Sequence, residues 1–174
     1  MFKIIVELFF LVIIQAAITP FIRRLAFVLG AVDNPNARRV NKKPMPTLGG
    51  LGIFVTYNIG AFVLLREQFP THELFSVLLA SSVVVLTGMI DDILELKPRQ
   101  KMIGIFVAAL IIYFLAGIRM NVLNLPFIHN EVHLGWWSLP ITIFWILALT
   151  NAVNLIDGLD GLADGVSMIS LITM

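Results

Sequence analysis

Five long apolar runs, separated by short polar segments, dominate the pattern of this chain. Each run holds roughly 15–17 residues, near the lower limit for a helix that crosses a hydrocarbon core about 30 Å thick. Flanking Gly, Ala and Thr residues lengthen every run enough to span. Because backbone polar groups in lipid must be satisfied within their own segment, the runs predict helices. They are Phe2–Ile18, Leu51–Leu65, Leu74–Ile90, Ile103–Ile118 and Leu139–Val153.

A sixth apolar run, Val166–Met174, reaches the last residue of the chain. As a helix it would cover only about 14 Å, or about half of a hydrocarbon core. We therefore expect a truncated sixth helix, and the N-terminal half of a longer protein. The predicted fold is an all-α, polytopic membrane helix bundle of five complete spanning helices plus this truncated one, in a single integral membrane domain over residues 1–174.

The composition agrees with a membrane protein. Hydrophobic residues make up 59% of the chain and charged residues 13%, whereas soluble domains carry about 25% charged residues. The absence of Cys excludes disulfides and thiolate metal sites. No small-residue cleavage site follows the first run, which favours a first spanning helix over a removed signal peptide. A net charge of +1 gives no indication of a nucleic-acid partner.

Lys and Arg are distributed unevenly between the two sides of this predicted bundle. The connections 19–50, 91–102 and 154–165 hold nine of the 12 basic residues, whereas the opposite side holds Lys3, Arg66 and Arg119. Cytoplasmic connections carry the excess of Lys and Arg, so the first three segments are predicted to be cytoplasmic and the N-terminus to lie outside.

The connection 119–138 on the predicted outer side contains several Asn, Pro and Gly residues. Val122, Leu123, Phe127 and Ile128 lie between these breakers and predict a short hairpin. Trp136 and Trp137 follow it, and Trp is enriched where a protein crosses the membrane–water interface. We interpret the pair as an interfacial anchor.

Three carboxylates follow the fifth apolar run. Acidic residues beside a bilayer core are costly, so Asp157, Asp160 and Asp164 form a functional-site hypothesis. Their spacing would place all three on one face of a helix, but the interleaved glycines indicate that part of the segment is a loop. For Asp160 and Asp164 a simple packing role of the glycines is an equally good interpretation. Asp157 is favoured by Asn151 and Asn154 just upstream.

A second acidic group, Asp91-Asp92, is predicted at the cytoplasmic end of the third helix. Adjacent helical residues point about 100° apart, so the two side chains are expected to do different work. One would hold a divalent cation, while the other accepts a proton or orients a Lys. Mg²⁺ suits carboxylates that have few other protein ligands and lie near phosphates. A plain helix end is a weak alternative, because anionic groups at a helix C-terminus oppose its dipole.

The third group is the basic segment Arg38–Gly50, which ends in Pro-Met-Pro-Thr-Leu-Gly-Gly. Its Lys and Arg side chains and its exposed backbone N–H groups suit an anion. Ordinary cytosolic charge that only sets the topology explains the basic residues equally well. Together the three groups favour transfer of a phosphoryl group involving a lipid-borne acceptor. A cation-coupled transporter would need acids at mid-helix depth, and an idle membrane scaffold would leave Asp91-Asp92 unexplained.

Three motifs resemble the polyprenyl-phosphate N-acetylhexosamine-1-phosphate transferases, of the glycosyltransferase 4 type. They are Lys43-Pro-Met-Pro-Thr-Leu-Gly-Gly50, Gly88-Met-Ile-Asp-Asp92 followed by Leu96-Lys-Pro98 and Lys101, and the segment from Asn151 to Gly165. In their residues, the first two motifs are most similar to those of the undecaprenyl-phosphate N-acetylglucosaminyl 1-phosphate transferases that start wall teichoic acid synthesis.

The resemblance implies a bacterial cell-membrane enzyme in which undecaprenyl phosphate attacks a UDP-N-acetylhexosamine and releases UMP. It implies Mg²⁺, with Mn²⁺ as the alternative ion, and leaves a homodimer open. Family members continue through further helices with a later acidic motif and a His-containing loop, so this chain alone is expected to be inactive. The implied catalytic residues are Asp91, Asp92 and Asp157, with Asp92 and Asp157 on the metal, and the implied substrate-binding residues are Lys43, Thr47, Lys101, Asn151, Asn154 and Asp160.

Overall fold

The computed structural model describes residues 2–33, 43–124, 131–157 and 161–173. Two compact units make up the chain, Met1–Gly117 and Ile118–Met174. Helices account for nearly all of the regular structure that is described, and the strands form two hairpins of two residues a strand. The all-α prediction is therefore confirmed.

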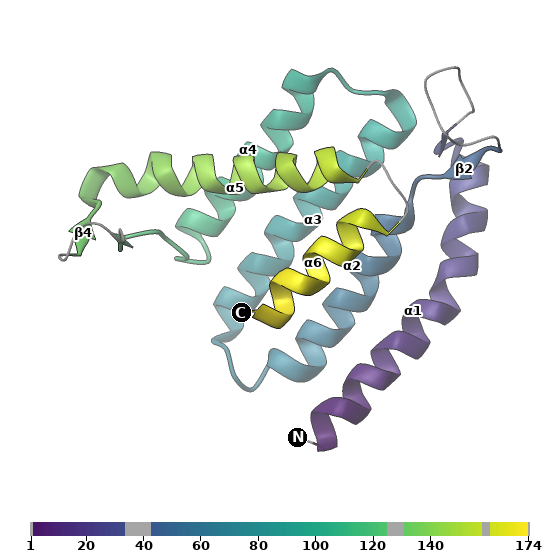
Figure 1. Cartoon of the computed structure of the whole chain (residues 1–174), viewed down its shortest axis with the longest axis horizontal. Helices are drawn as coiled ribbons and strands as arrows, with labels where there is room; N and C mark the ends of the chain where they lie inside the picture. The colour runs from purple at the N-terminus through teal and green to yellow at the C-terminus, as the bar shows by residue number, and fades with distance from the viewer. Residues whose placement is uncertain (1, 34–42, 125–130, 158–160, 174) are drawn as a thin grey trace. The chain divides into compact units, whose positions relative to one another are not determined.

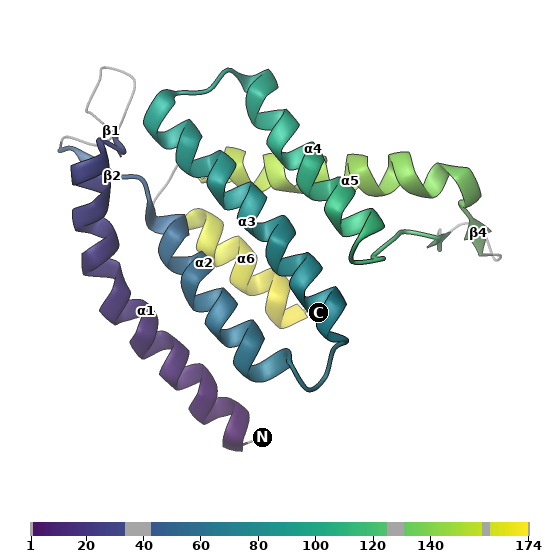
Figure 2. The ribbon, with the colours of Figure 1, turned by 180° about the vertical axis from the view of Figure 1, so that it is seen from behind.

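The described residues of the first unit form four α-helices that pack in series (Figure 1): α1 on α2, α2 on α3, and α3 on α4. Successive helices run in opposite directions. The α1–α2 connection and the α3–α4 corner consequently lie at one end of the unit, whereas the N-terminus and the α2–α3 connection lie at the other (Figures 1 and 2). Their bounds are α1 (Phe2–Leu29), α2 (Gly49–Gly60) with the π-helical turn η1 (Ala61–Leu65), α3 (Thr71–Leu94) and α4 (Pro98–Phe114).

Helix α1 is longer than its apolar run predicts. It continues past Ile18, through Pro20 to Leu29, so Arg23 and Arg24 lie on the helix and not in the connection. The sequence boundary was wrong because a proline removes only one helical hydrogen bond, and because Arg stems can lie along apolar surface while their charged ends reach water. Gly30, at φ 73°, follows the last turn in the left-handed conformation that ends many helices.

Close packing joins α1 to α2. The Thr56 hydroxyl of α2 donates a hydrogen bond of 2.6 Å to Gln15 Oε1 of α1. A Cβ added at Gly52 would lie 3.1 Å from Gln15 Nε2, and one added at Gly60 would lie 2.8 Å from Leu11 Cδ1. Small residues and interhelical hydrogen bonds are typical of helix contacts in membranes, where apolar burial does not drive helices together.

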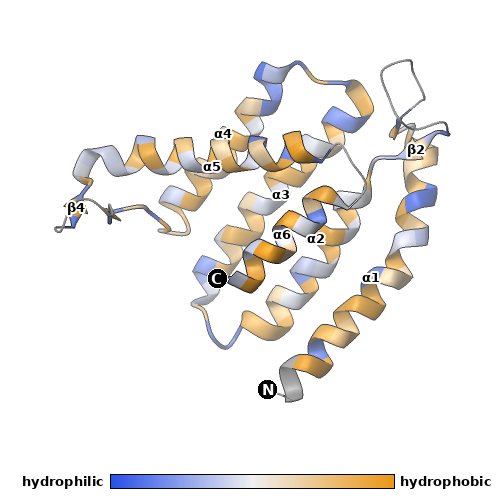
Figure 3. Ribbon diagram, viewed as in Figure 1, coloured by the Kyte–Doolittle hydropathy of each residue, from blue (hydrophilic) through white to orange (hydrophobic). Residues whose placement is uncertain are grey.

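The described helices have the dimensions and surface of membrane spans. Three are long and apolar enough to cross a membrane by length and composition: Ile5–Leu29, Thr71–Leu94 and Gly135–Ile156. The apolar helices Gly49–Leu65 and Leu162–Thr173 are shorter. Most residues of these helices are hydrophobic (Figure 3), and their large apolar side chains remain exposed, which suits a lipid environment and not water. The protein is thus a membrane protein, while the count of five spans stays a prediction.

The second unit begins with a hairpin. Its strands β3 (Val122–Leu123) and β4 (Val132–His133) pair antiparallel, with Val122 opposite His133. The predicted hairpin is confirmed for its first strand, but the partner strand is Val132–His133; Phe127 and Ile128 lie outside the described residues. Helices α5 (Ser138–Ile156) and α6 (Leu162–Thr173) complete the unit.

Polar contacts attach this hairpin to the start of α5. Thr142 Oγ1 accepts the Met120 N–H at 3.0 Å, and the Ser138 hydroxyl donates to Asn121 Oδ1 at 3.1 Å. The adjoining 3₁₀ turn η2 (Gly135–Trp137) leaves Trp136 98% exposed and Trp137 69% exposed. Two indole rings that contact little protein are available to a membrane interface, and their role as an anchor stays a prediction.

Candidate active site

A small hairpin lies in the connection between α1 and α2. Strands β1 (Val32–Asp33) and β2 (Met45–Pro46) pair antiparallel. Directly after β2, the Thr47 N–H donates to the Ala31 carbonyl at 3.1 Å, and the Thr47 hydroxyl donates to the same oxygen at 3.0 Å. Strands of two residues are too short to show an alternation of apolar and polar residues, so this hairpin could not be predicted from the sequence.

A compact apolar cluster fixes the hairpin against α3. Ala26, Ala31 and Leu48 are almost completely buried, and Ile22 and Met89 pack against them. Met89 lies on α3, three residues before Asp92. The cluster therefore holds the segment after β2 beside the last turn of α3.

The same arrangement brings Thr47 to Asp92, since their side chains are hydrogen-bonded. The Thr47 hydroxyl has a single proton, which it donates either to the Ala31 carbonyl or to the Asp92 carboxylate. The substrate-binding role expected for Thr47 from the sequence stays a prediction. In the structure the Thr47 side chain contacts Ala31 and Asp92, and it therefore supports that carboxylate.

Thr47→Val is expected to lower the free energy of unfolding by about 1 kcal/mol, because it removes one partly buried hydrogen bond and keeps the shape of the side chain. Thr47→Ser retains the hydroxyl and should stay close to wild type. Thermal unfolding of the detergent-solubilised chain measures both. Equal stabilities for the Val and Ser variants would contradict the supporting role of the hydroxyl.

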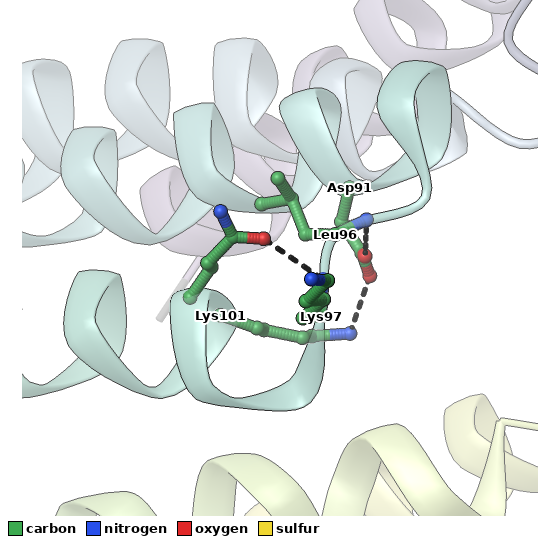
Figure 4. A network of polar contacts seen from close by, with 5 residues as sticks. Asp91, Leu96, Lys97 and Lys101 are labelled. Carbon is green, nitrogen blue, oxygen red and sulfur yellow. Dashed lines mark hydrogen bonds and ion pairs between the residues drawn. The ribbon is translucent and has the colours of Figure 1, made fainter.

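Asp91 organises the corner between α3 and α4 (Figure 4). Its Oδ1 accepts the Leu96 N–H at 3.1 Å, and its Oδ2 forms an ion pair of 2.8 Å with Lys101 Nζ. The corner turns at Glu95, whose left-handed φ of 48° costs an L-residue about 1–2 kcal/mol. The Glu95 N–H donates to the Asp91 carbonyl at 2.8 Å, so both the backbone and the side chain of Asp91 stabilise this turn.

The first turn of α4 holds Lys101 in place for that ion pair. Pro98 is the first residue of α4, where its fixed φ suits the helix and its missing N–H is not needed. The Lys97 N–H donates to Gln100 Oε1 at 3.0 Å. With this end of the helix capped, the ammonium of Lys101 lies beside Asp91, and their side chains are 25% and 23% exposed respectively.

The two adjacent aspartates consequently have different surroundings, as their helical spacing predicts. Asp91 orients a lysine. Asp92 is exposed and forms no ion pair with any described residue; the described side chain bonded to it is Thr47. Since the last turn of α3 carries no basic residue, the helix dipole disfavours both carboxylates by about 0.3–1 kcal/mol each. Lys101 offsets this for Asp91, and Asp92 is the better candidate for chemistry.

Three of the predicted site residues of the second unit lie at the end of α5: Asn151, Asn154 and Asp157. Asn151 Nδ2 donates to the Leu147 carbonyl at 2.9 Å, and Asn154 lies exposed one turn later. Asp157 follows the last residue of α5 and is exposed. Like Asp92, it is a carboxylate at a helix C-terminus, where the dipole is unfavourable.

The three aspartates of this segment do not share one helix. Asp157 closes α5, Asp164 lies in the first turn of α6, and Asp160 lies outside the described residues. The common face would have required one continuous helix, and the break between α5 and α6 agrees with the loop that the glycines indicate. The physical reason for the break is the glycine content: Gly161 adopts a φ of 79°, which a regular helix does not contain, and each glycine weakens a helix by about 1 kcal/mol.

The predicted site residues thus fall into two groups. The α3–α4 end of the first unit brings together Thr47, Asp91, Asp92 and Lys101, with Lys43 exposed just before β2 at the same end. The end of α5 in the second unit carries Asn151, Asn154 and Asp157. Within the part of the chain that is described, no three acidic or histidine side chains are grouped to hold a metal. Asp92 and Asp157 nevertheless each offer the exposed carboxylate that Mg²⁺ takes when waters and phosphate oxygens complete its shell.

Acidic residues in the three long apolar helices lie near their ends. Glu7 and Glu73 are close to the starts of the first two, Asp91 and Asp92 are in the last turn of the second, and Gly135–Ile156 has none. A transporter that uses carboxylates as its ion path would place them at mid-helix depth. These fully described helices do not favour that alternative.

Comparison with known proteins identifies the family. Residues 74–174, more than half of the chain, match glycosyl transferase family 4. The chain is 37% identical over its whole length to a Bacillus subtilis (strain 168) protein named "Probable undecaprenyl-phosphate N-acetylglucosaminyl 1-phosphate transferase", covering 48% of that protein. It is 31% identical over 98% of its length to a phospho-N-acetylmuramoyl-pentapeptide-transferase of Bacillus velezensis, covering 56% of it.

A third relative comes from Yersinia pestis and is named undecaprenyl-phosphate alpha-N-acetylglucosaminyl 1-phosphate transferase. It is 30% identical over 94% of this chain, which covers 44% of it. The chain spans about half the length of the curated relatives that it matches. By its sequence match over residues 74–174, the chain belongs to glycosyl transferase family 4.

Proposed function

We propose that the protein represented by this chain transfers N-acetylglucosamine 1-phosphate from UDP-N-acetylglucosamine to undecaprenyl phosphate. An oxygen of the lipid phosphate attacks the phosphorus next to the sugar. The bond from that phosphorus to the bridging oxygen breaks, and UMP leaves. The names of the Bacillus subtilis and Yersinia pestis relatives support both the lipid acceptor and the sugar. The product would begin the synthesis of a cell-wall or surface glycan.

The observation that carries this proposal is the contrast between Asp91 and Asp92. Transfer between two anionic phosphates needs positive charge for the phosphates and a carboxylate that is available for a cation or a proton. The Asp91–Lys101 pair holds an ammonium group at one place, while Asp92, supported by Thr47, forms no ion pair with any described residue. Lys43 would add a second cation at the same end of the unit.

In this proposal Asp157, Asn151, Asn154 and Asp160 serve the nucleotide, and Asp92 and Asp157 are the carboxylates that would hold Mg²⁺ or Mn²⁺. The ion, when bound, supplies charge neutralisation on the phosphate oxygens. Asp92 would also take part in activating the attacking lipid phosphate. The basic residues of the connections 19–50 and 91–102 favour the cytoplasmic face for this chemistry, with the N-terminus outside.

The test is UMP release by a protein of the full length of its relatives, given undecaprenyl phosphate, Mg²⁺ and one UDP-sugar. We expect release with UDP-N-acetylglucosamine, and none without the lipid phosphate or after chelation of the metal. The 174-residue chain alone should be inactive. Release only with UDP-N-acetylmuramoyl-pentapeptide would overturn the proposed donor, and release without any lipid phosphate would overturn the reaction.

A further inference from the structure

Two neighbouring backbone N–H groups at the corner between α3 and α4 are bound by side chains (Figure 4). The Leu96 N–H donates to Asp91 Oδ1 at 3.1 Å, and the Lys97 N–H donates to Gln100 Oε1 at 3.0 Å. Asp91 also binds Lys101 Nζ, at 2.8 Å. Gln100 thus fixes the half of the corner that the Asp91 side chain does not reach.

The start of α4 depends on this contact more than most helix starts do. Its N-cap residue is Lys97, whose side chain has no hydrogen-bond acceptor and so cannot cap the helix as Ser, Thr, Asp or Asn would. The first turn also carries no acidic residue. Gln100 lies at the third helical position, from which Gln or Glu can reach back to the N-cap N–H. Its amide therefore supplies the side-chain cap that Lys97 cannot.

Lys97 connects this cap to Lys101. Its N–H is bound by the Gln100 side chain, and its carbonyl accepts the Gln100 N–H at 2.9 Å and the Lys101 N–H at 3.3 Å. The backbone of Lys101 is thus attached to a residue that is bound through both its N–H and its carbonyl. The position from which the Lys101 side chain reaches Asp91 consequently depends on Gln100.

From these contacts we infer that Gln100 is a positioning residue, which fixes the first turn of α4 and thereby the Lys101 ammonium for a substrate phosphate. The inference rests on the proposed function, in which that ammonium serves a phosphate. An ion pair whose side chains are about one quarter exposed is too weak to position a flexible lysine by itself. The cap on Lys97 supplies the remaining constraint, because it orders the backbone from which Lys101 extends.

Gln100→Met tests this role, because Met has a similar length and helix propensity but only a weak sulfur acceptor. We expect kcat/KM for UMP release by the full-length protein to fall about tenfold, with a raised KM for at least one of the two phosphate substrates. This is less than the roughly 10²-fold cost of a misplacement of about 1 Å, since Asp91 still binds Lys101. A loss of stability alone would lower the amount of active protein and leave KM unchanged.

Gln100→Glu is the conservative variant, because it keeps an acceptor for the Lys97 N–H. It also lowers the net charge by one unit, as Arg99→Gln does at the neighbouring residue of the same turn. We expect these two variants to have equal activity, above that of Gln100→Met. In a Lys101→Met background, Gln100→Met should cause no further loss. Wild-type activity in Gln100→Met, or the same loss with and without Lys101, would overturn the inference.

Acetylation of Lys101 gives a readout that is independent of transfer activity. The 174-residue chain in detergent is treated with limiting acetic anhydride, and mass spectrometry gives the labelling ratio of Lys101 to Lys43, an exposed lysine that precedes β2. Asp91→Asn should raise this ratio, because the ion pair shields the amine. Gln100→Met should raise it toward the same value, and Gln100→Glu should leave it at the wild-type value.

The two readouts separate the inference from the proposed function. An unchanged labelling ratio in Gln100→Met would overturn the positioning role even if activity falls. A raised ratio with an unchanged KM for both substrates would overturn it as well, because the placement of Lys101 would then not matter to the phosphates. If the wild-type full-length protein releases no UMP, the proposed function fails, and the labelling ratio still decides whether Gln100 places Lys101.

Discussion

Asp92→Asn is expected to reduce sugar 1-phosphate transfer by about 10²–10⁴-fold, the usual contribution of a side chain that accepts or positions a proton. Asn has nearly the same shape as Asp and can still accept a hydrogen bond from Thr47, so the last turn of α3 should be unchanged. What disappears is the negative charge that a metal ion or a proton requires. The measurement is the rate of UMP release by the full-length protein at saturating UDP-N-acetylglucosamine and lipid phosphate, alongside thermal unfolding.

Asp91→Asn is the matched control for that experiment. It removes the ion pair with Lys101 but retains an acceptor for the Leu96 N–H. Because both side chains are about one quarter exposed, we expect a loss of about 1 kcal/mol in the free energy of unfolding and a smaller loss of activity than in Asp92→Asn. If both variants lose activity equally and neither loses stability, the division of roles between the two aspartates is wrong.

The fold could be predicted from the sequence wherever a helix faces lipid along its whole length. Lipid-facing helices are apolar on most sides, so the runs locate α1 to α5 well. Their ends are harder, because an arginine near a membrane surface suits both a helix and a connection. Arg23 and Arg24 on α1 are the example. The hairpin of β1 and β2 left no signal, since its register depends on buried contacts of Ala31 and Leu48 and not on alternation.

The candidate site shows the same limit at the level of side chains. Helical spacing alone predicts that Asp91 and Asp92 differ, but it does not say which of them pairs with a lysine. That choice depends on the left-handed turn at Glu95, which brings Lys101 back beside Asp91. The contact of Thr47 with Asp92 is likewise tertiary, because it joins residues 45 positions apart through the packing of Met89. Residue roles that depend on such tertiary contacts cannot be predicted from the spacing of residues within a motif.

Gly104→Ala is expected to destabilise the chain by about 1–3 kcal/mol and to lower activity with it. Gly104 lies where α4 crosses α3, and a Cβ there would overlap the side chain of Thr87. Thr87 cannot simply rotate away, since it is β-branched and its hydroxyl is hydrogen-bonded to the Val83 carbonyl at 2.7 Å. The helices must therefore separate about one turn from the Asp91–Lys101 ion pair, which would weaken the corner that orients Lys101.

Two further variants make this prediction specific to the helix crossing. Gly88→Ala adds the same methyl group beside Thr87 on α3, where a Cβ meets no atom within 4 Å, and should leave stability unchanged or raise it by about 0.5–1 kcal/mol. Thr87→Ala in the Gly104→Ala background removes the two nearest atoms, Oγ1 and Cγ2, and should restore part of the lost stability. Thermal unfolding in detergent measures all three. A Gly104→Ala chain as stable as Gly88→Ala would show that α3 and α4 do not need this close approach, and that the corner is held by its own capping hydrogen bonds and ion pair alone.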